Sequence, residues 1–419
     1  AFTSITSGAI RQTAIRLYYS YITIQNLDFR GGSNTSVRIT NADYLIFDGC
    51  NIGWQTDRCG IDANATTEGT TVNNCEVKNC TFDVGTISLA YNYENQSTLD
   101  GLRLSQGVDT WSIHNNTFKN WGHGGLMVEG LTTGYTSSNI LFFDNYITAP
   151  DVYYGRALGV VTNQGMGSGI KLYRNYIYDC SVSNQLGSTG LEFYYNIIDH
   201  KNRNGEVAAK DWQTCAGIEI SNPYTVDVTG TKIYNNVIAN THDAGIVLSP
   251  FGAGTYNVAG VDITNNIIFN CGQSVRSGGY SLYEYDQQLG ANTFRNNLIY
   301  KSGTTDLIYY GHDATNDYPH TIAEFNDEDG NSGDVISGNI TGDPLLQADY
   351  KVLVGSPAIN TGISVALTSD YFGNPIKGLP DIGVFEYQGN NPNALNKVLK
   401  STSTGKAYYN PVTGRFYVK

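Results

Sequence analysis

Apolar and polar residues alternate in short runs along most of the chain, and each run is broken by an asparagine-rich bend. Residues 261–270 read VDITNNIIFN, and TKIYNNVIAN at 231–240 and NTFRNNLIYK at 292–301 repeat the pattern. Alternate residues of a β-strand point to the same face, so each run predicts two short strands joined by a sharp turn. The period of two also argues against the helix pairs that build other repeat proteins.

Aligned on apolar-x-x-Asn-x-apolar, the runs define one repeated column with a mean spacing of about 31 residues. Such a period is typical of a solenoid, in which each repeat stacks on its neighbours. With three short strands per coil, the prediction is an all-β, right-handed parallel β-helix, a three-sheet solenoid of about eleven coils. The column contains Leu27, Cys50, Cys80, Asn116, Asn145, Asn175, Asn196, Asn236, Asn266, Asn297 and Asn339.

We interpret this asparagine column as structural rather than as a binding site. Asparagine accepts the left-handed backbone that a sharp corner needs, and stacked side-chain amides can hydrogen-bond along the rod. Cys50 and Cys80 replace asparagine on adjacent coils. Their predicted spacing of about 5 Å would permit a disulfide, but we expect two buried, stacked thiols.

Composition narrows the function. The 419 residues are 40% hydrophobic and include 47 glycines and 31 tyrosines, a mixture suited to short strands and turns. The net charge of −13 argues against nucleic acid as a partner. No apolar run approaches the roughly 20 residues of a membrane span. The seven cysteines include no CxxC pair, so the sequence predicts no metal site of cysteine ligands.

The C-terminal part departs from the repeat. GDPLLQADYKVLVGSPAINTGI (342–363) and DYFGNPIKGLPDIGVFEY (370–387) are not coil sequences. Together with the repeats, they resemble secreted bacterial right-handed β-helix proteins of the pectate-lyase-like superfamily. The resemblance implies a polysaccharide context but no single reaction, because such proteins include lyases, hydrolases, epimerases and tail-spike proteins. We therefore predict a β-helix over 1–341, a capping segment over 342–395 and a basic, then aromatic, tail over 396–419.

The strands that open successive coils predict a charged face. In SVRIT, GIDAN, GLRLS, GLMVE and GIEIS the apolar residues alternate inward, which leaves one outward column along the rod. This column contains Arg38, Asp62, Arg103 and Met127, and then Glu219 and Val247 further along the rod. A ladder of exposed ion pairs is one interpretation, worth less than about 1 kcal/mol per pair. The other is a carbohydrate groove, as the resemblance implies, with Arg38 and Glu219 binding substrate.

Two long insertions, 83–100 and 199–215, precede strands of the same face. Long loops on a regular scaffold often carry function, and these bring Tyr93, Asp100 and Trp212 to its edge. Because aromatic rings stack on sugars, we expect Tyr93, Trp121 and Trp212 to bind substrate, although each tryptophan could instead cap the core.

His123 lies between glycines in NWGHGGLMVE, which resembles the G-H-G of β-helix polygalacturonases. The paired aspartates and the R-I-K element of those enzymes are not found at the corresponding places. The acidic stretch EFNDEDGNSGD (324–334) is a calcium candidate, with a solvated loop as the simpler alternative.

Two reactions fit the charged face. Glycoside hydrolysis needs two carboxyl groups, which Asp62, Asp100 and Glu129 could supply. Elimination next to a uronate carboxylate needs a base and a neutralising cation, which His123, Arg103 and Arg38 could supply.

We expect a secreted or cell-surface polysaccharide-degrading enzyme, with a hydrolase ahead of a lyase because of the acidic composition. A non-catalytic glycan-binding or tail-spike-like fibre protein, associated with a virion, is the alternative from another class. The expected partner is a polysaccharide, and the expected state is a monomer or a homotrimer.

Overall fold

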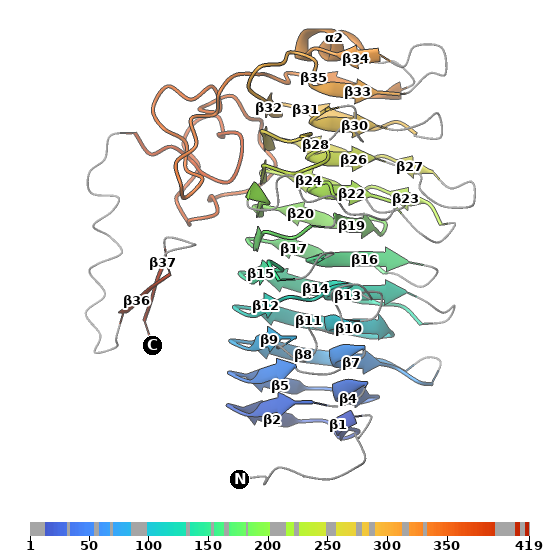
Figure 1. Cartoon of the computed structure of the whole chain (residues 1–419). Helices are drawn as coiled ribbons and strands as arrows, with labels where there is room; N and C mark the ends of the chain where they lie inside the picture. Colours follow the sequence, from blue (N-terminus) through green and yellow to red (C-terminus); the bar gives the residue numbers. More distant parts are fainter. Residues whose placement is uncertain are drawn as a thin grey trace.

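The chain forms a tall stack of short strands in which each coil contributes one strand to each of three sheets (Figure 1). This computed structural model describes residues 13–31, 34–53, 58–67, 70–84, 99–130, 135–151, 155–162, 167–181, 183–201, 215–221, 226–248, 257–273, 279–284, 290–311, 318–329, 333–389, 407–410 and 415–418.

Sheet A opens each coil. Its order is β1 (Thr13–Leu17), β4 (Thr35–Thr40), β7 (Cys59–Asn64), β10 (Asp100–Gln106), β13 (Gly124–Gly130), β16 (Leu158–Thr162), β19 (Asn184–Gly187), β22 (Ile218–Ile220), β26 (Ile246–Leu248), β30 (Leu282–Glu284), β33 (Ile308–Tyr310) and β34 (Tyr318–His320). The pairs are parallel except the last, β33–β34, which is antiparallel.

Sheet B follows in each coil. Its order is β2 (Ile22–Gln25), β5 (Leu45–Asp48), β8 (Val72–Lys78), β11 (Val108–His114), β14 (Ser138–Phe143), β17 (Lys171–Tyr173), β20 (Glu192–Tyr194), β24 (Lys232–Tyr234), β28 (Asp262–Thr264), β31 (Thr293–Arg295) and β35 (Val335–Ser337).

Sheet C closes each coil. Its order is β3 (Asp28–Arg30), β6 (Asn51–Gly53), β9 (Thr81–Asp83), β12 (Thr117–Lys119), β15 (Tyr146–Thr148), β18 (Tyr176–Tyr178), β21 (Ile197–Asp199), β25 (Val237–Ala239), β29 (Ile267–Phe269) and β32 (Leu298–Tyr300). Along the parallel pairs, the order in each sheet advances by one coil per strand. This confirms the predicted three-sheet parallel β-helix.

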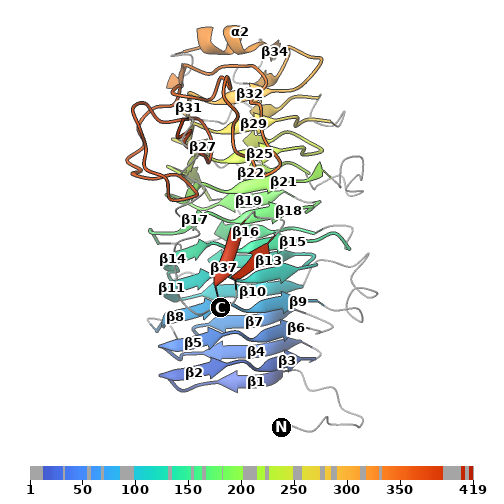
Figure 2. The same ribbon diagram turned by 90° about the vertical axis from the view of Figure 1, so that its left-hand side faces the viewer.

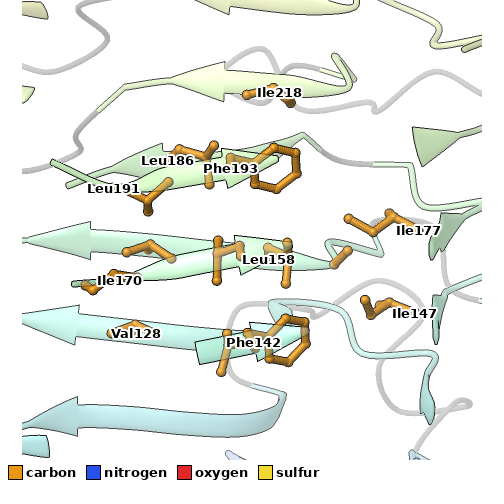
Figure 3. Packing of buried hydrophobic residues seen from close by; sticks show 14 of the residues in the cluster. Val128, Phe142, Ile147, Leu158, Ile170, Ile177, Leu186, Leu191, Phe193 and Ile218 are labelled. Atoms are coloured by element: carbon orange, nitrogen blue, oxygen red, sulfur yellow. The ribbon is translucent and has the colours of Figure 1, made fainter. Parts of the chain in front are cut away.

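The core runs along the inside of the stack and consists of the inward residues of all three sheets (Figure 3). Phe142 and Phe193 point into it from sheet B, Leu158 from sheet A and Ile177 from sheet C. Each of these four side chains is fully buried. Since an aliphatic or aromatic side chain contributes about 1.5–3 kcal/mol when buried, stacking the coils is the main source of stability.

The asparagine column forms the predicted ladder between sheets B and C. Each side-chain amide from Asn116 to Asn297 donates to the Oδ1 of the next ladder asparagine at 2.9–3.2 Å. The predicted left-handed backbone, however, belongs to the residue before each ladder position, such as Asn115, Asn235 and Asn265, with φ of 52–57°. That residue turns the chain, and the turn directs the ladder amide inward.

Cys50 and Cys80 continue the ladder without a disulfide. Both are buried free thiols, and the Cys50 amide N–H donates to the Cys80 Sγ at 3.4 Å. The two stacked thiols that the sequence predicted are confirmed.

Residues 342–388 lie beside the solenoid rather than across its end (Figure 2). Val352, Tyr371 and Ile382 pack in one buried cluster with Tyr195 and Val237 of the coils. The Asn235 amide also donates to the carbonyl oxygens of Asp381 and Gly383. The segment predicted as a cap therefore forms a lateral support.

The end of the stack is closed by α2 (Ile322–Asp327), which begins at Thr321 with a capping box. Phe325 of α2 is fully buried and packs edge-on against Phe294 and Tyr310. None of the helices in the described part of the chain is long and apolar enough to cross a membrane.

Two pairs of short strands complete the described structure. β23 (Val228–Thr229) and β27 (Val258–Ala259) pair in parallel, and β36 (Ala407–Asn410) and β37 (Arg415–Val418) form an antiparallel hairpin.

Candidate functional site

The outward face of sheet A brings the predicted charged residues onto one surface. Arg38 of β4 is in register with Asp62 of β7, and Asp62 is in register with Arg103 of β10. Arg103 is followed by Met127 of β13 and then by Gly159 of β16. The column predicted from the alternation of the opening strands is therefore present, with Arg38, Asp62, Arg103 and Met127 on successive coils and Glu219 three coils beyond Met127.

Two arginine–carboxylate pairs connect neighbouring coils. Arg38 donates from a guanidinium nitrogen to Asp62 Oδ2 at 2.9 Å, and the Ser105 hydroxyl donates to Asp62 Oδ1 at 3.0 Å. Arg103 contacts Glu129 Oε2 through Nη2 at 2.6 Å and Nε at 2.8 Å. Two of the three carboxyl groups that the hydrolase interpretation named, Asp62 and Glu129, thus already bind a guanidinium.

Burial and charge shift the pKa of both members of the Arg103–Glu129 pair. Burial raises the pKa of Glu129, although the charge of Arg103 opposes the shift. Burial alone would lower the pKa of Arg103, but the negative charges of Glu129 and Asp100 raise it overall. Arg103 is consequently a permanent cation within a partly buried site.

His123 and Asp100 form a second kind of pair at the rim of the same face. Asp100 begins β10, and His123 directly precedes β13, so adjacent coils bring them together. His123 Nδ1 lies 2.9 Å from Asp100 Oδ1. Since a carboxylate only accepts hydrogen bonds, Nδ1 is the donor in this pair, and in a neutral imidazole Nε2 then has a free lone pair.

In all three pairs the basic group is the accessible one. The side chains of Arg38, Arg103 and His123 are 30%, 21% and 30% exposed. Their partners Asp62, Glu129 and Asp100 are only 3%, 6% and 1% exposed. A molecule that approaches this part of sheet A therefore meets guanidinium and imidazole groups, with the carboxylates beneath them.

Two further polar residues lie on this face, Arg156 and Gln185, and the sequence did not predict them as part of the site. Arg156 precedes β16, and its Nη1 donates to the Gln185 Oε1 of β19 at 3.3 Å. Gln185 in turn donates to the Ser221 hydroxyl, which donates to Glu219. Burial lowers the pKa of Arg156, while the charges of Glu219 and Asp100 oppose that shift. The coil reads GRALGVV here and lacks the glycine-apolar-x-apolar opening that most of the other strands share.

The aromatic substrate-binding residues need a correction. Trp121 is 1% exposed, and its indole N–H donates to the Phe82 carbonyl oxygen at 3.1 Å. It closes the core and offers no ring face to a sugar. Tyr93 and Trp212 lie outside the described residues.

The acidic stretch at 324–334 provides no cation site among the residues that the structure describes. Glu324 completes the helix capping box, and Asp329 accepts a backbone hydrogen bond from Ile336. Asp334 accepts hydrogen bonds from the Asn292 N–H and the Tyr310 hydroxyl. These acidic groups are used to close the end of the solenoid.

Comparison with known proteins places the coils in a sequence family. The model of the family described as "Right handed beta helix region" matches residues 100–326. No curated protein sequence matches the chain.

Among solved structures, an alginate lyase from Paenibacillus sp. str. FPU-7 is similar with a TM-score of 0.43 and 14% identity, over 66% of this chain and 87% of that one. The pectate lyase Pel9A is similar with a TM-score of 0.37 and 15% identity, over 86% of this chain and 76% of that one. A mannuronic acid specific polysaccharide family 6 lyase from human gut microbiota is similar with a TM-score of 0.39 and 12% identity, over 80% of this chain and 86% of that one.

Proposed function

The chain belongs to the family of right-handed β-helix proteins, and on this scaffold we propose a lyase that cleaves uronate-containing polysaccharides on the outward face of sheet A. The observation that supports the proposal is the arrangement of charged groups on this face. Arg38, Arg103 and His123 are accessible, and the carboxylates that pair with them are buried. This local surface suits an anionic sugar despite the net charge of −13, because its exposed groups are N–H donors and the carboxylates that pair with them are buried.

The two arginines, which lie two coils apart, bind uronate carboxylates of the polysaccharide. A guanidinium has five N–H donors, so Arg38 and Arg103 can each keep a buried carboxylate and still donate outward. The buried partners hold the guanidinium planes in place, which reduces the entropy lost when substrate binds. Neutralising the uronate carboxylate makes the adjacent C5 proton more acidic.

His123 is the general base. Its Nδ1–H is held by Asp100, which leaves the Nε2 lone pair to take the C5 proton. The electron pair of the C5–H bond forms the C4–C5 double bond, and the C4–O bond to the neighbouring sugar breaks. The imidazolium returns its proton to the leaving oxygen, so the enzyme ends in its starting state. The products are a new reducing end and an unsaturated uronate.

The hydrolase alternative has one observation in its favour, the raised pKa of Glu129, since a general acid must hold its proton near neutral pH. A hydrolase also needs a second, ionised carboxylate that reaches the sugar or its water. Asp62 and Asp100 are 2% and 1% exposed and bind Arg38 and His123, so each lies behind a basic group.

A digestion screen tests the proposal. The full-length protein is incubated with neutral and with uronate-containing polysaccharides, with and without a calcium chelator. New reducing ends and the ultraviolet absorbance of unsaturated uronate are followed together. We expect both signals, and only on uronate substrates. Reducing ends without absorbance would show a hydrolase instead, and absence of both signals with retained polysaccharide binding would favour a glycan-binding fibre protein.

The variant His123→Ala should lower the elimination rate by about 10²–10⁴-fold, the usual contribution of a general base. His114 is a matched control, because it forms a similar pair with Glu76 at 3.0 Å on the outer face of sheet B. His114→Ala should leave the rate unchanged. Equal losses in both variants would show that the effect is on folding and not on catalysis.

A further inference from the structure

A second cluster of reactive side chains lies at the same corner of the solenoid, further along the rod. Cys215 precedes β22, and His242 and Asp243 precede β26 on the next coil. The Asp243 N–H donates to the Cys215 carbonyl oxygen at 3.2 Å, so the two backbones are directly paired. One ligand atom from each of the three side chains lies within 4.8 Å of the other two.

The cluster is buried. Cys215 and Asp243 are 4% and 3% exposed, and the His242 side chain is 14% exposed. The Cys215 N–H donates to Asp243 Oδ2 at 2.7 Å, which fixes the orientation of the carboxylate. The other oxygen, Oδ1, is buried and has no hydrogen-bond partner among the described residues. It lies 3.8 Å from His242 Nδ1, beyond hydrogen-bonding distance.

A buried carboxylate oxygen without a partner is costly and calls for a compensating group. A cation between Asp243 Oδ1 and His242 Nδ1 would supply it. Two ligand atoms bound to one tetrahedral zinc ion lie about 3.4 Å apart, given bonds of about 2.0–2.2 Å. The observed 3.8 Å requires only a small contraction.

We infer that Cys215, His242 and Asp243 form a binding site for a divalent transition-metal ion of the zinc class. The ligand set selects the metal, because thiolate and imidazole suit zinc or cobalt and are poor ligands for calcium or magnesium. Binding displaces the thiol proton of Cys215 to solvent and places the thiolate, one imidazole nitrogen and Asp243 Oδ1 on the ion. Three protein ligands leave a fourth position for water. The site is separate from the His123–Asp100 pair and independent of the proposed lyase activity.

Neighbouring coils hold the three ligands rigidly, which favours a defined geometry over adventitious binding. The sequence does not predict this site, because Cys215 lies 27 residues before the adjacent His242 and Asp243, and the three residues form no CxxC or HxxxH motif. Only the coil pairing brings Cys215 beside Asp243.

Cobalt binding tests the inference directly. The full-length protein is reduced, stripped of metal with a chelator and titrated with Co²⁺, while thiolate-to-cobalt charge-transfer absorption and the tetrahedral d–d bands are recorded. We expect both features to saturate at one ion per chain and to be displaced by Zn²⁺. We also expect Zn²⁺ to raise the melting temperature of the stripped protein.

Three variants locate the site. Cys215→Ser should abolish the charge-transfer band, and His242→Gln should weaken Zn²⁺ binding at least tenfold while altering the most exposed of the three side chains. Cys180→Ser removes a buried thiol from another coil and should leave the band intact. The inference is overturned if wild-type protein shows no band, or if the band survives in Cys215→Ser. If Cys215→Ser does not fold, the inference is tested with His242→Gln instead. An unchanged circular dichroism spectrum would show that this variant is folded.

Discussion

At the residue scale, the ladder asparagines and the asparagines before them have different structural roles. Asn175 accepts from the Asn145 backbone and side-chain amides, and its own amide donates to the Phe142 carbonyl oxygen and to Asn196. All of these groups are buried, so Asn175→Ala would leave several of them unpaired. We expect a loss of at least about 3 kcal/mol in the free energy of unfolding, measured by urea denaturation.

Asn79 provides the contrast. It has a left-handed φ of 55°, is exposed and donates one hydrogen bond to Asp48. Glycine adopts that backbone freely, so Asn79→Gly should change the free energy of unfolding by less than about 1 kcal/mol. Similar losses in Asn175→Ala and Asn79→Gly would mean that the corner, and not the amide ladder, is the source of stability.

At the element scale, the glycine near the start of the sheet A strands lets them approach the core closely. A Cβ on Gly101 of β10 would lie 2.5 Å from the Gly125 carbonyl oxygen and 2.7 Å from the Phe118 ring. The backbone oxygen is held by the sheet and cannot move away, so Gly101→Ala should cost about 1–3 kcal/mol. Thermal unfolding measures this, with Ser112→Ala of β11 as a control that adds no atoms. An unchanged melting temperature for Gly101→Ala would show that β10 can shift outward.

The same strands show how far the sequence predicts the site. Alternation places Arg38, Asp62 and Arg103 in one column because the period of a strand is strict. It does not say which charge pairs with which, since Arg103 turns to Glu129 two positions further along β13 rather than to Asp62. Trp121 was misassigned because an aromatic residue in a turn has the same pattern whether it faces solvent or core.

At the scale of the whole molecule, the interior of the solenoid includes a buried carboxyl group near its last coils. Glu284 of β30 is 1% exposed, accepts a hydrogen bond from the Asn292 amide, and lies near Asp334. Burial is the main cause that raises the pKa of Glu284 well above its ordinary value, and the negative charge of Asp334 raises it further. The folded chain therefore binds this proton more tightly than the unfolded chain does.

The stability of the rod should then depend on pH with a definite sign. The contribution of Glu284 is fully present below its unfolded pKa of about 4.3 and is lost as pH rises through the higher folded value. We expect the free energy of unfolding to fall over this range, and Glu284→Gln to flatten the fall and stabilise the protein at neutral pH. Urea denaturation at a series of pH values measures both.

The variant Glu324→Gln is the control that separates this local effect from general charge repulsion. Like Glu284→Gln, it removes one carboxyl group from the same acidic protein. Glu324 is exposed, and its hydrogen bonds to Thr321 in the capping box lower its pKa. Its ionised form is therefore the stabilising one, so Glu324→Gln should weaken the protein at neutral pH. If both substitutions instead stabilise it equally, repulsion across the acidic molecule, rather than the buried carboxyl group at its end, sets the pH dependence.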